Sequence, residues 1–282
     1  MKLKRDLLTL VLVLCSTSAT YFVTVSTAQQ GTPMVQATAD NEYQAGATLW
    51  MQKAGECRAL AYQAFNLARW QLDYDLDKKN VKKLPKEERK RPRAVMVDID
   101  ETVLDNSPAQ AYNIKNRLVF NPKDWYAWGE MRKAKAIPGA VDFINYATSK
   151  GVKVFFVSNR DEVQKQATMD NLKNVGFADV TPDNVLLRTT EASKEARREL
   201  ILKTYRIVFF MGDNLDDHSN VFERKSVIDR FAEVDKAKGM FGKKYIMLPN
   251  AMYGTWENAI YEYGRLTDTQ KSEKRVNALE LP

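Results

Sequence analysis

Two carboxylates spaced one residue apart, Asp98 and Asp100, are the side chains of this sequence whose types and spacing could do chemistry. Two such groups repel each other, and the arrangement is unfavourable unless a cation lies between them. The pair therefore predicts a site that holds Mg²⁺ and handles a phosphate group. Taken alone, the same pattern is equally typical of an acidic turn, so the rest of the chain has to decide between the two interpretations.

The carboxylates follow an apolar run at residues 94–97, which predicts a strand buried in the middle of a parallel sheet. Such strands place their functional side chains at the carboxyl end, where a crevice opens. Further strands are predicted at residues 152–157, 185–187, 206–211 and 245–248. Helical segments separate these strands, so we expect an α/β fold with a mostly parallel sheet and helices on both faces.

Polar clusters at three other points of the predicted fold would meet the two carboxylates in the same crevice. They are Ser158-Asn159 after one strand, Lys194 near the start of a basic helix, and Asp213 with Asp217 after another strand. Alone, Ser158-Asn159 is typical of a plain turn, and Lys194 is one of many surface lysines. Together and in this order, the clusters are a strong indication of one site.

The remaining segments predict how this site is enclosed. Residues 41–282 are long enough for a single domain with a cap. Apolar side chains recur at helical spacing in residues 42–74, which predicts one or two helices with their Trp and Phe side chains in the core. The aromatic-rich segment from about 105 to 136 predicts a small helical cap inserted after the carboxylates. Residues 256–280 predict a helical, amphipathic end.

Much of the net charge of +7 lies in residues 77–93, which are rich in Lys and Arg. Such a run could attract nucleic acid or anionic lipid. Interleaved Glu, the Pro residues and the absence of aromatic side chains favour a solvated surface loop, so we expect no nucleic-acid partner. A weak role in steering anionic substrates stays open.

Residues 1–28 are predicted to be a signal peptide, because a basic start precedes an apolar core and a small-residue cleavage site ends at Ala28. A flexible leader would follow at residues 29–40. The apolar stretch is nearly long enough to span a bilayer, so an uncleaved membrane anchor is the competing interpretation. Lipidation at Cys15 is a further alternative, although Leu14 fits poorly before it. We therefore expect an exported protein that is periplasmic, cell-surface or outer-membrane associated, or secreted.

With these clusters in place, the chain resembles the class C bacterial acid phosphatases, the secreted or outer-membrane-lipoprotein type within the haloacid dehalogenase superfamily. The resemblance covers about residues 41–275, and its four aspartates are highly specific to that group. The chain departs from the family in its poor lipidation motif and its long basic run, which bear on anchoring and not on the chemistry. The motifs that carry the resemblance are residues 98–106 (DIDETVLDN), 157–160 (VSNR), 212–217 (GDNLDD) and 248–254 (LPNAMYG).

The resemblance implies a haloacid dehalogenase-like fold and a role for each polar residue. Asp98 would attack phosphorus and form an aspartyl-phosphate, while Asp100 would protonate the leaving oxygen and then activate water. Mg²⁺ would be bound by the carboxylates of Asp98 and Asp213 and the backbone carbonyl of Asp100, with Asp217 completing or orienting the metal shell. The phosphoryl oxygens would be held by Ser158, Asn159 and Lys194.

The short predicted cap leaves the crevice open, which suits small phosphomonoesters. In the family, one aromatic residue from the cap and one from the carboxyl-terminal segment flank the substrate, and Trp125 and Tyr253 fall at the matching positions. Because aromatic rings can stack on a base, this favours 5′-nucleotidase activity on 5′-nucleotides or nicotinamide mononucleotide. Packing in the core is the alternative for Trp125. The family also implies an acidic pH optimum and a homodimer.

Other phosphatase classes do not fit the sequence. Histidine acid phosphatases need a catalytic His and a second His, and this chain has one, His218. Cysteine phosphatases need a Cys-x₅-Arg motif, which Cys57 does not have. Two alternatives stay open: a phosphotransferase that passes the phosphoryl group to an alcohol with the same residues, and a non-enzymatic surface binding protein. Loss of Asp98 or Asp100 would have marked the second, and both are present.

Overall fold

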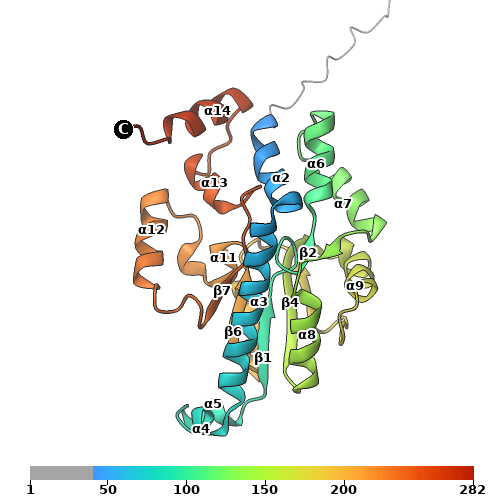
Figure 1. Ribbon diagram of the computed structural model, residues 1–282, viewed down its shortest axis with the longest axis vertical. Coiled ribbons are helices and arrows are strands. Elements are labelled where there is room, and N and C mark those ends of the chain that lie inside the picture. Colours follow the sequence, from blue (N-terminus) through green and yellow to red (C-terminus); the bar gives the residue numbers. More distant parts are fainter. Residues whose placement is uncertain (1–40) are drawn as a thin grey trace, which may run out of the picture. The chain divides into compact units, whose positions relative to one another are not determined.

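The computed structural model describes residues 41–282, and Figure 1 shows how their helices and strands are arranged. The predicted signal peptide at residues 1–28 and the leader at residues 29–40 lie outside this range, as does the alternative lipidation site at Cys15. Within residues 41–282, no helix is both long enough and apolar enough to cross a membrane.

A five-stranded parallel sheet in the order β5-β4-β1-β6-β7 carries the fold. Its central strand, β1, lies between β4 and β6, and the side chains at residues 94–97 are at most 2% exposed. The predicted α/β fold with a parallel sheet is therefore confirmed. The strands are β1 Arg93–Val97, β4 Lys153–Asp161, β5 Val185–Arg188, β6 Arg206–Gly212 and β7 Tyr245–Met247.

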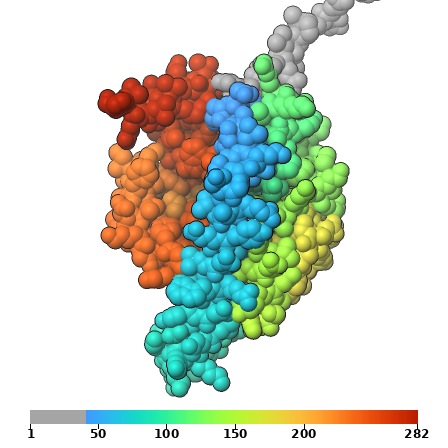
Figure 2. Space-filling model, viewed as in Figure 1, coloured from blue at the N-terminus to red at the C-terminus, as the bar shows by residue number. Residues whose placement is uncertain are grey.

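Helices connect the strands and form both ends of the described chain. The longer ones are α2 Ala45–Lys53, α3 Gly55–Leu76, α6 Ser107–Asn116, α7 Pro122–Met131, α8 Ala140–Ser149, α9 Lys165–Asn174, α10 Glu195–Thr204, α12 Val227–Lys236 and α14 Asp268–Asn277. The short ones are α4 Lys78–Val81, α5 Lys86–Lys90, α11 Leu215–His218 and α13 Thr255–Ile260, with 3₁₀ helices η1 Glu42–Gln44, η2 Glu162–Gln164 and η3 Asn220–Phe222. Figure 2 shows α2 and α3 as a blue band between the cap side in green and the carboxyl-terminal helices in orange and red.

Both faces of the sheet are covered because successive side chains of β1 point to opposite sides. Val95 and Val97 belong to the larger core, which includes side chains of α3 and α8. Ala94 and Met96 face the other way and pack in a smaller cluster with Ile201 of α10. β1 is therefore dry on both sides, and its polar groups are confined to its carboxyl end.

A short two-stranded antiparallel sheet joins the cap to the main domain. Its strands are β2 Leu104–Asp105 and β3 Lys135–Ala136, and α6 and α7 lie between them in the chain. The cap was predicted to be helical, and these two strands were not predicted. Each strand has only two residues, which is too few for an alternating apolar pattern to be visible in the sequence. Because β2 begins directly after the loop that carries Asp100, the small sheet connects the cap to the site.

The basic run at residues 77–93 is not the plain loop that we predicted, because it contains α4 and α5. The Asp77 side chain caps α4 by accepting a hydrogen bond from Lys79 N at 2.8 Å, which satisfies a free N–H group of the first turn. In α5, acidic side chains occupy the first turn and basic ones the last, so the charges complement the helix dipole. The number of charges in the sequence shows neither the cap of α4 nor the arrangement of charges along α5.

The helical segments at the two ends also differ from the prediction. In residues 42–74, Phe65 is buried as expected, but Trp50 is only half-buried and Trp70 is 62% exposed. Helical spacing in the sequence shows that the apolar side chains lie on one face of the helix. Which of these side chains are buried depends on how the rest of the domain packs against that face. The carboxyl-terminal segment is interrupted between α13 and α14, where Glu262 and Tyr263 adopt φ values of 53° and 57°. This left-handed backbone ends α13.

Candidate active site

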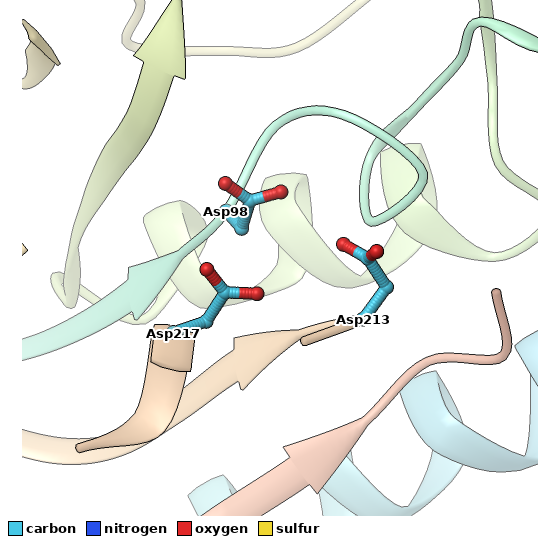
Figure 3. A group of neighbouring side chains, drawn as sticks. All are labelled: Asp98, Asp213 and Asp217. Carbon is cyan, nitrogen blue, oxygen red and sulfur yellow. The ribbon is translucent and has the colours of Figure 1, made fainter. Parts of the chain in front are cut away.

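The carboxyl ends of β1 and β6 bring three predicted carboxylates together. Asp98 follows β1, Asp213 follows β6, and Asp217 lies in the short helix α11. One carboxylate oxygen from each lies within 4.8 Å of the other two, and Figure 3 shows the three groups turned toward a shared space. Oxygen donors of this kind suit a hard divalent cation. The cluster could therefore hold a divalent metal ion.

A buried lysine lies between two of these carboxylates. Lys194 directly precedes α10, is 4% exposed, and forms ion pairs with Asp98 and with Asp217, the latter at 2.6 Å. Burial alone would lower the pKa of Lys194, but the two carboxylates outweigh this effect and the pKa is raised. Lys194 therefore stays charged and offsets part of the negative charge of the cluster.

The cluster still carries more negative charge than Lys194 can balance. Burial raises the pKa of Asp98 well above its usual range; Lys194 opposes this shift, and the neighbouring carboxylates add to it. Burial likewise raises the pKa of Asp213 to about 7, although Asn250 and Thr102 donate hydrogen bonds to its carboxylate at 2.9 and 3.1 Å. A cation among these groups would relieve the repulsion, which is a second reason, from the residues themselves, that a metal fits.

Asp217 packs directly against the glycine that ends β6. Its Oδ2 accepts a hydrogen bond from Asn214 N at 3.0 Å, as part of a capping box at the start of α11. A Cβ added to Gly212 would lie 2.4 Å from both Cβ and Oδ2 of Asp217. Glycine is needed at this position because the two residues approach so closely. The adjacent Asp216 instead forms an ion pair with Arg230 at 3.2 Å.

We expect the Gly212→Ala substitution to weaken the binding of a divalent metal by about 10- to 100-fold, the usual effect of disturbing the support of a metal ligand. The added methyl group must displace the Asp217 carboxylate from the cluster. Isothermal titration calorimetry with a divalent cation measures the affinity. Gly239→Ala is the matched control, because no atom lies within 4 Å of a Cβ added there. An unchanged affinity of the Gly212→Ala protein would contradict the prediction.

The Asp100 carboxylate is bound by a different set of side chains. Ser158 Oγ donates a hydrogen bond to its Oδ2 at 3.0 Å, Asn106 Nδ2 donates to Oδ1 at 2.8 Å, and Arg160 Nη2 donates to Oδ1 at 2.8 Å. Ser158, which we predicted as a phosphate ligand, is thus a neighbour of Asp100 in this structure. The two carboxylates of the motif therefore have separate environments.

The second predicted phosphate ligand of this strand end, Asn159, is exposed. Its side-chain oxygen accepts a hydrogen bond from Arg197 Nη2 at 2.7 Å, and Arg197 also binds the backbone oxygen of Ser158 at 2.6 Å. No role was predicted from the sequence for Arg160, Asn106 or Arg197. The first two stand inside the motifs at residues 157–160 and 98–106, so their places in the motifs were the available indication.

A cavity of about 640 Å³ joins the carboxylates to the cap. Trp125 and Tyr253, predicted to flank a substrate, both line it. The Trp125 ring is half-buried and lies 6.4 Å from that of Phe120, measured between centroids. The lining also includes Arg275 of α14, whose guanidinium carbon lies 3.6 Å from the centroid of the Tyr43 ring. The cavity is thus lined by carboxylates, by aromatic side chains and by cations.

Known proteins resemble this chain in sequence and in fold. The family described as HAD superfamily, subfamily IIIB (Acid phosphatase) matches residues 12–256. A solved structure of the class C acid phosphatase from Bacillus anthracis is similar, with 41% sequence identity, a TM-score of 0.79, and coverage of 86% of this chain and 98% of that chain. A structure of the class C acid phosphatase from Bacillus anthracis with tungstate bound shows 40% identity, the same TM-score of 0.79 and the same coverage.

Two plant proteins are similar over a shorter length. Acid phosphatase 1 of Solanum lycopersicum is 30% identical over 127 residues, which are 43% of this chain and 49% of that protein. Vegetative storage protein 2 of Arabidopsis thaliana is 25% identical over 126 residues, which are 43% of this chain and 48% of that protein. The chain thus matches about half the length of these curated relatives.

Proposed function

This chain belongs to the acid phosphatases of HAD superfamily subfamily IIIB, and from that premise we propose that it is a Mg²⁺-dependent acid phosphatase. It hydrolyses phosphomonoesters through an aspartyl-phosphate formed on Asp98. The observation that carries the proposal is the cluster of Asp98, Asp213 and Asp217, in which Lys194 pairs with Asp98 and Asp217 and which shares one cavity with Asp100.

In the first half-reaction, a carboxylate oxygen of Asp98 attacks the phosphorus atom of the ester. A P–O bond forms to Asp98, the P–O bond to the leaving alcohol breaks, and the Asp100 carboxyl group gives its proton to the leaving oxygen. The products are a free alcohol and the aspartyl-phosphate. The separate hydrogen-bond partners of the two carboxylates support this division of roles, because environments that differ allow two carboxyl groups to do different tasks.

In the second half-reaction, a water oxygen attacks the phosphorus atom while Asp100, now a carboxylate, takes a proton from that water. The P–O bond to Asp98 breaks, which releases inorganic phosphate and restores both carboxyl groups to their starting states. Lys194 stays charged beside Asp98 throughout. Its positive charge opposes the repulsion between the Asp98 carboxylate and the approaching phosphate, and it stabilises the charge of the transferring group.

The carboxylates of Asp98, Asp213 and Asp217 would hold the Mg²⁺, with the backbone carbonyl of Asp100 as a further candidate ligand. The choice of Mg²⁺ rests on the oxygen-only donor set and on the raised pKa values of Asp98 and Asp213, which arise first from burial and then from the neighbouring carboxylates. A bound Mg²⁺ supplies the positive charge that lets a carboxylate nucleophile and a phosphate dianion approach each other.

We assign the substrate class as 5′-nucleotides or nicotinamide mononucleotide. Trp125 and Tyr253 line the cavity that contains the carboxylates, and two aromatic rings on such a wall can stack on a base. The class C acid phosphatase from Bacillus anthracis was solved with tungstate bound, and tungstate is a tetrahedral oxyanion like phosphate. A relative that binds such an oxyanion supports a site for the phosphoryl group in this chain, and the aromatic side chains of the cavity would then contact the nucleobase.

Phosphate release from a panel of nucleotides and small phosphomonoesters, with Mg²⁺ and with EDTA, tests the proposal. We expect release that depends on Mg²⁺ and is lost in EDTA, because the repulsion within the cluster is then unrelieved. Trp125→Ala should raise KM about 10-fold for a nucleotide and leave KM for glycerol phosphate unchanged, since only the first has a base to stack. Absence of release from folded protein in both conditions would refute the function.

A further inference from the structure

Arg160, at the carboxyl end of β4, is the buried cation on the Asp100 side of the cavity. It is 3% exposed. Its Nε and Nη2 donate hydrogen bonds to Asp100 Oδ1 at 2.9 and 2.8 Å, and Nε also lies 3.3 Å from Oδ2. Two nitrogens of the guanidinium group thus donate to the same carboxylate oxygen. Charge-assisted hydrogen bonds of this kind fix the orientation of the two side chains and also stabilise the pair.

The rest of the guanidinium group donates hydrogen bonds to protein side chains, so it is not free to bind a phosphate. Nη1 donates to Thr168 Oγ1 of α9 at 3.2 Å, and Nη2 donates to Asn106 Oδ1 at 3.1 Å. The guanidinium carbon lies 5.3 Å from the centroid of the Trp125 ring. All three nitrogens of Arg160 therefore have partners in the protein, and the side chain is locked in one orientation.

Asn106 connects this arrangement to the cap. Its Nδ2 donates to Asp100 Oδ1 at 2.8 Å, and its Oδ1 accepts from Arg160 and from Trp128 Nε1 of α7, the latter at 2.8 Å. Asn106 is 2% exposed. An amide that both donates to Asp100 and accepts from Arg160 can satisfy these contacts in only one orientation.

The contacts are distributed unequally over the two oxygens of Asp100. Oδ1 accepts three hydrogen bonds, from Asn106 and twice from Arg160. Oδ2 has Ser158 Oγ at 3.0 Å and the long contact from Arg160 Nε. Oδ1 is thus filled with donors, and Oδ2 is the less occupied oxygen of the pair. The Asp100 side chain is 19% exposed, so this group reaches the cavity while its other oxygen is anchored.

We propose that Arg160 is a positioning residue for proton transfer: together with Asn106 it anchors Asp100 Oδ1, so that Oδ2 carries the proton to the leaving oxygen. This rests on the proposed function, in which Asp100 protonates the leaving alcohol. Lys194 and Arg160 are the two buried cations that line the cavity within the described residues. Lys194 then lies beside the nucleophile, and Arg160 lies beside the acid. The contacts of Arg160 to Asp100, Asn106 and Thr168 distinguish it from a residue that binds the transferring phosphate.

The dependence of the rate on the leaving group tests this role. p-Nitrophenolate leaves as a stable anion and needs no proton, whereas glycerol leaves as an unstable alkoxide unless it is protonated. We expect the Arg160→Lys substitution to lower kcat/KM for glycerol phosphate about 100-fold, the usual contribution of general acid catalysis, and for p-nitrophenyl phosphate less than 10-fold. The ratio of the two values on one preparation does not depend on the fraction of folded protein.

Two further variants make the outcomes decisive. Arg206→Lys is the matched control, because Arg206 is also buried and grips an aspartate, Asp75, at 2.7 Å through two nitrogens, but at the amino end of the sheet. Its ratio should equal that of the wild type. Asp100→Asn should change the ratio in the same direction as Arg160→Lys.

An equal loss on both esters in Arg160→Lys, or no loss on either, would overturn the positioning role. A failure of the proposed function is distinguishable from these results, because the wild type would then release phosphate from neither ester with Mg²⁺. If Asp100→Asn lowered kcat/KM equally for both esters, Asp100 would not be the acid of the first half-reaction and the positioning role would fall with it.

Discussion

Replacing Asp98 by Asn is expected to slow phosphate release by about 10⁵-fold or more, as for other enzymes that lose their nucleophile. An amide oxygen does not attack phosphorus to give a stable acyl-phosphate. The fold should persist, because Lys194 keeps its ion pair with Asp217 at 2.6 Å and the change removes one of several mutually repelling charges. Phosphate release and thermal unfolding, measured on the same preparation, check both parts of the expectation.

Asp216→Asn is the control for the Asp98→Asn experiment. Asp216 belongs to the same motif as Asp217, yet its carboxylate pairs with Arg230 at 3.2 Å and stands outside the cluster. We expect this variant to keep its turnover. Near-wild-type turnover by the Asp98→Asn protein, in contrast, would rule out Asp98 as the nucleophile.

Replacing Lys194 by Met is expected to lower turnover about 10³-fold and to destabilise the metal-free protein by about 3–5 kcal/mol. Lys194 is 4% exposed and contacts both Asp98 and Asp217. Met fills a similar volume without a charge, so the buried carboxylates lose their cation while packing is largely kept. Chemical denaturation in EDTA measures the loss of stability, and Mg²⁺ should restore part of it, because an ion that binds only the folded protein stabilises it.

The same experiment has a defined dependence on pH. Burial raises the pKa of Asp213 to about 7 in the folded protein, above its value of about 3.9 when unfolded. Asp213 therefore binds more protons in the folded state between these values, so this group makes the metal-free protein less stable as the pH rises from about 4 to about 7. Burial lowers the pKa of His218 to about 4, which acts in the opposite direction over most of this range. The part of the slope that comes from Asp213 should be larger in Lys194→Met and absent when Mg²⁺ is bound. A slope that is the same with and without Mg²⁺ would contradict the assignment of the cluster.

The strand ends that carry Asp98 and Asp213 could be predicted from the sequence. The apolar run before Asp98 is dry on both faces because it forms the central strand, and this made its burial visible in the sequence. The same reasoning placed Asp213 after β6. Parallel strands end at one edge of the sheet, so the order of elements was enough to bring these residues together.

Side-chain direction could not be predicted in this way. Ser158, predicted as a phosphate ligand, donates a hydrogen bond from its hydroxyl to Asp100, and this contact was not visible in the sequence. Arg160 lies 60 residues from Asp100 in the sequence, and its contact requires β4 to pair with β1 in the observed register. Likewise, the exposure of Trp70 depends on how far the domain extends over α3. Such features follow from tertiary packing, which a single sequence does not display.

The net charge of the described chain is confined to the end of β1 opposite to Asp98. Residues 77–93 contain nine Lys and Arg against three Asp and Glu, and the other residues in 41–282 contain equal numbers of the two kinds. Helix α3 spans the distance: it begins with Gly55, which lines a pocket with Glu101 and Asp105, and its last residue, Leu76, nearly reaches α4. At 22 residues it is about 33 Å long.

That length is more than three times the screening length of about 10 Å in 0.1 M salt. A phosphate ester that diffuses toward the cavity is therefore attracted very little by the positive run. The encounter rate is set by random collision and by the few cations at the cavity itself. Any dependence of this rate on salt would therefore come from the charges at the cavity and not from residues 77–93.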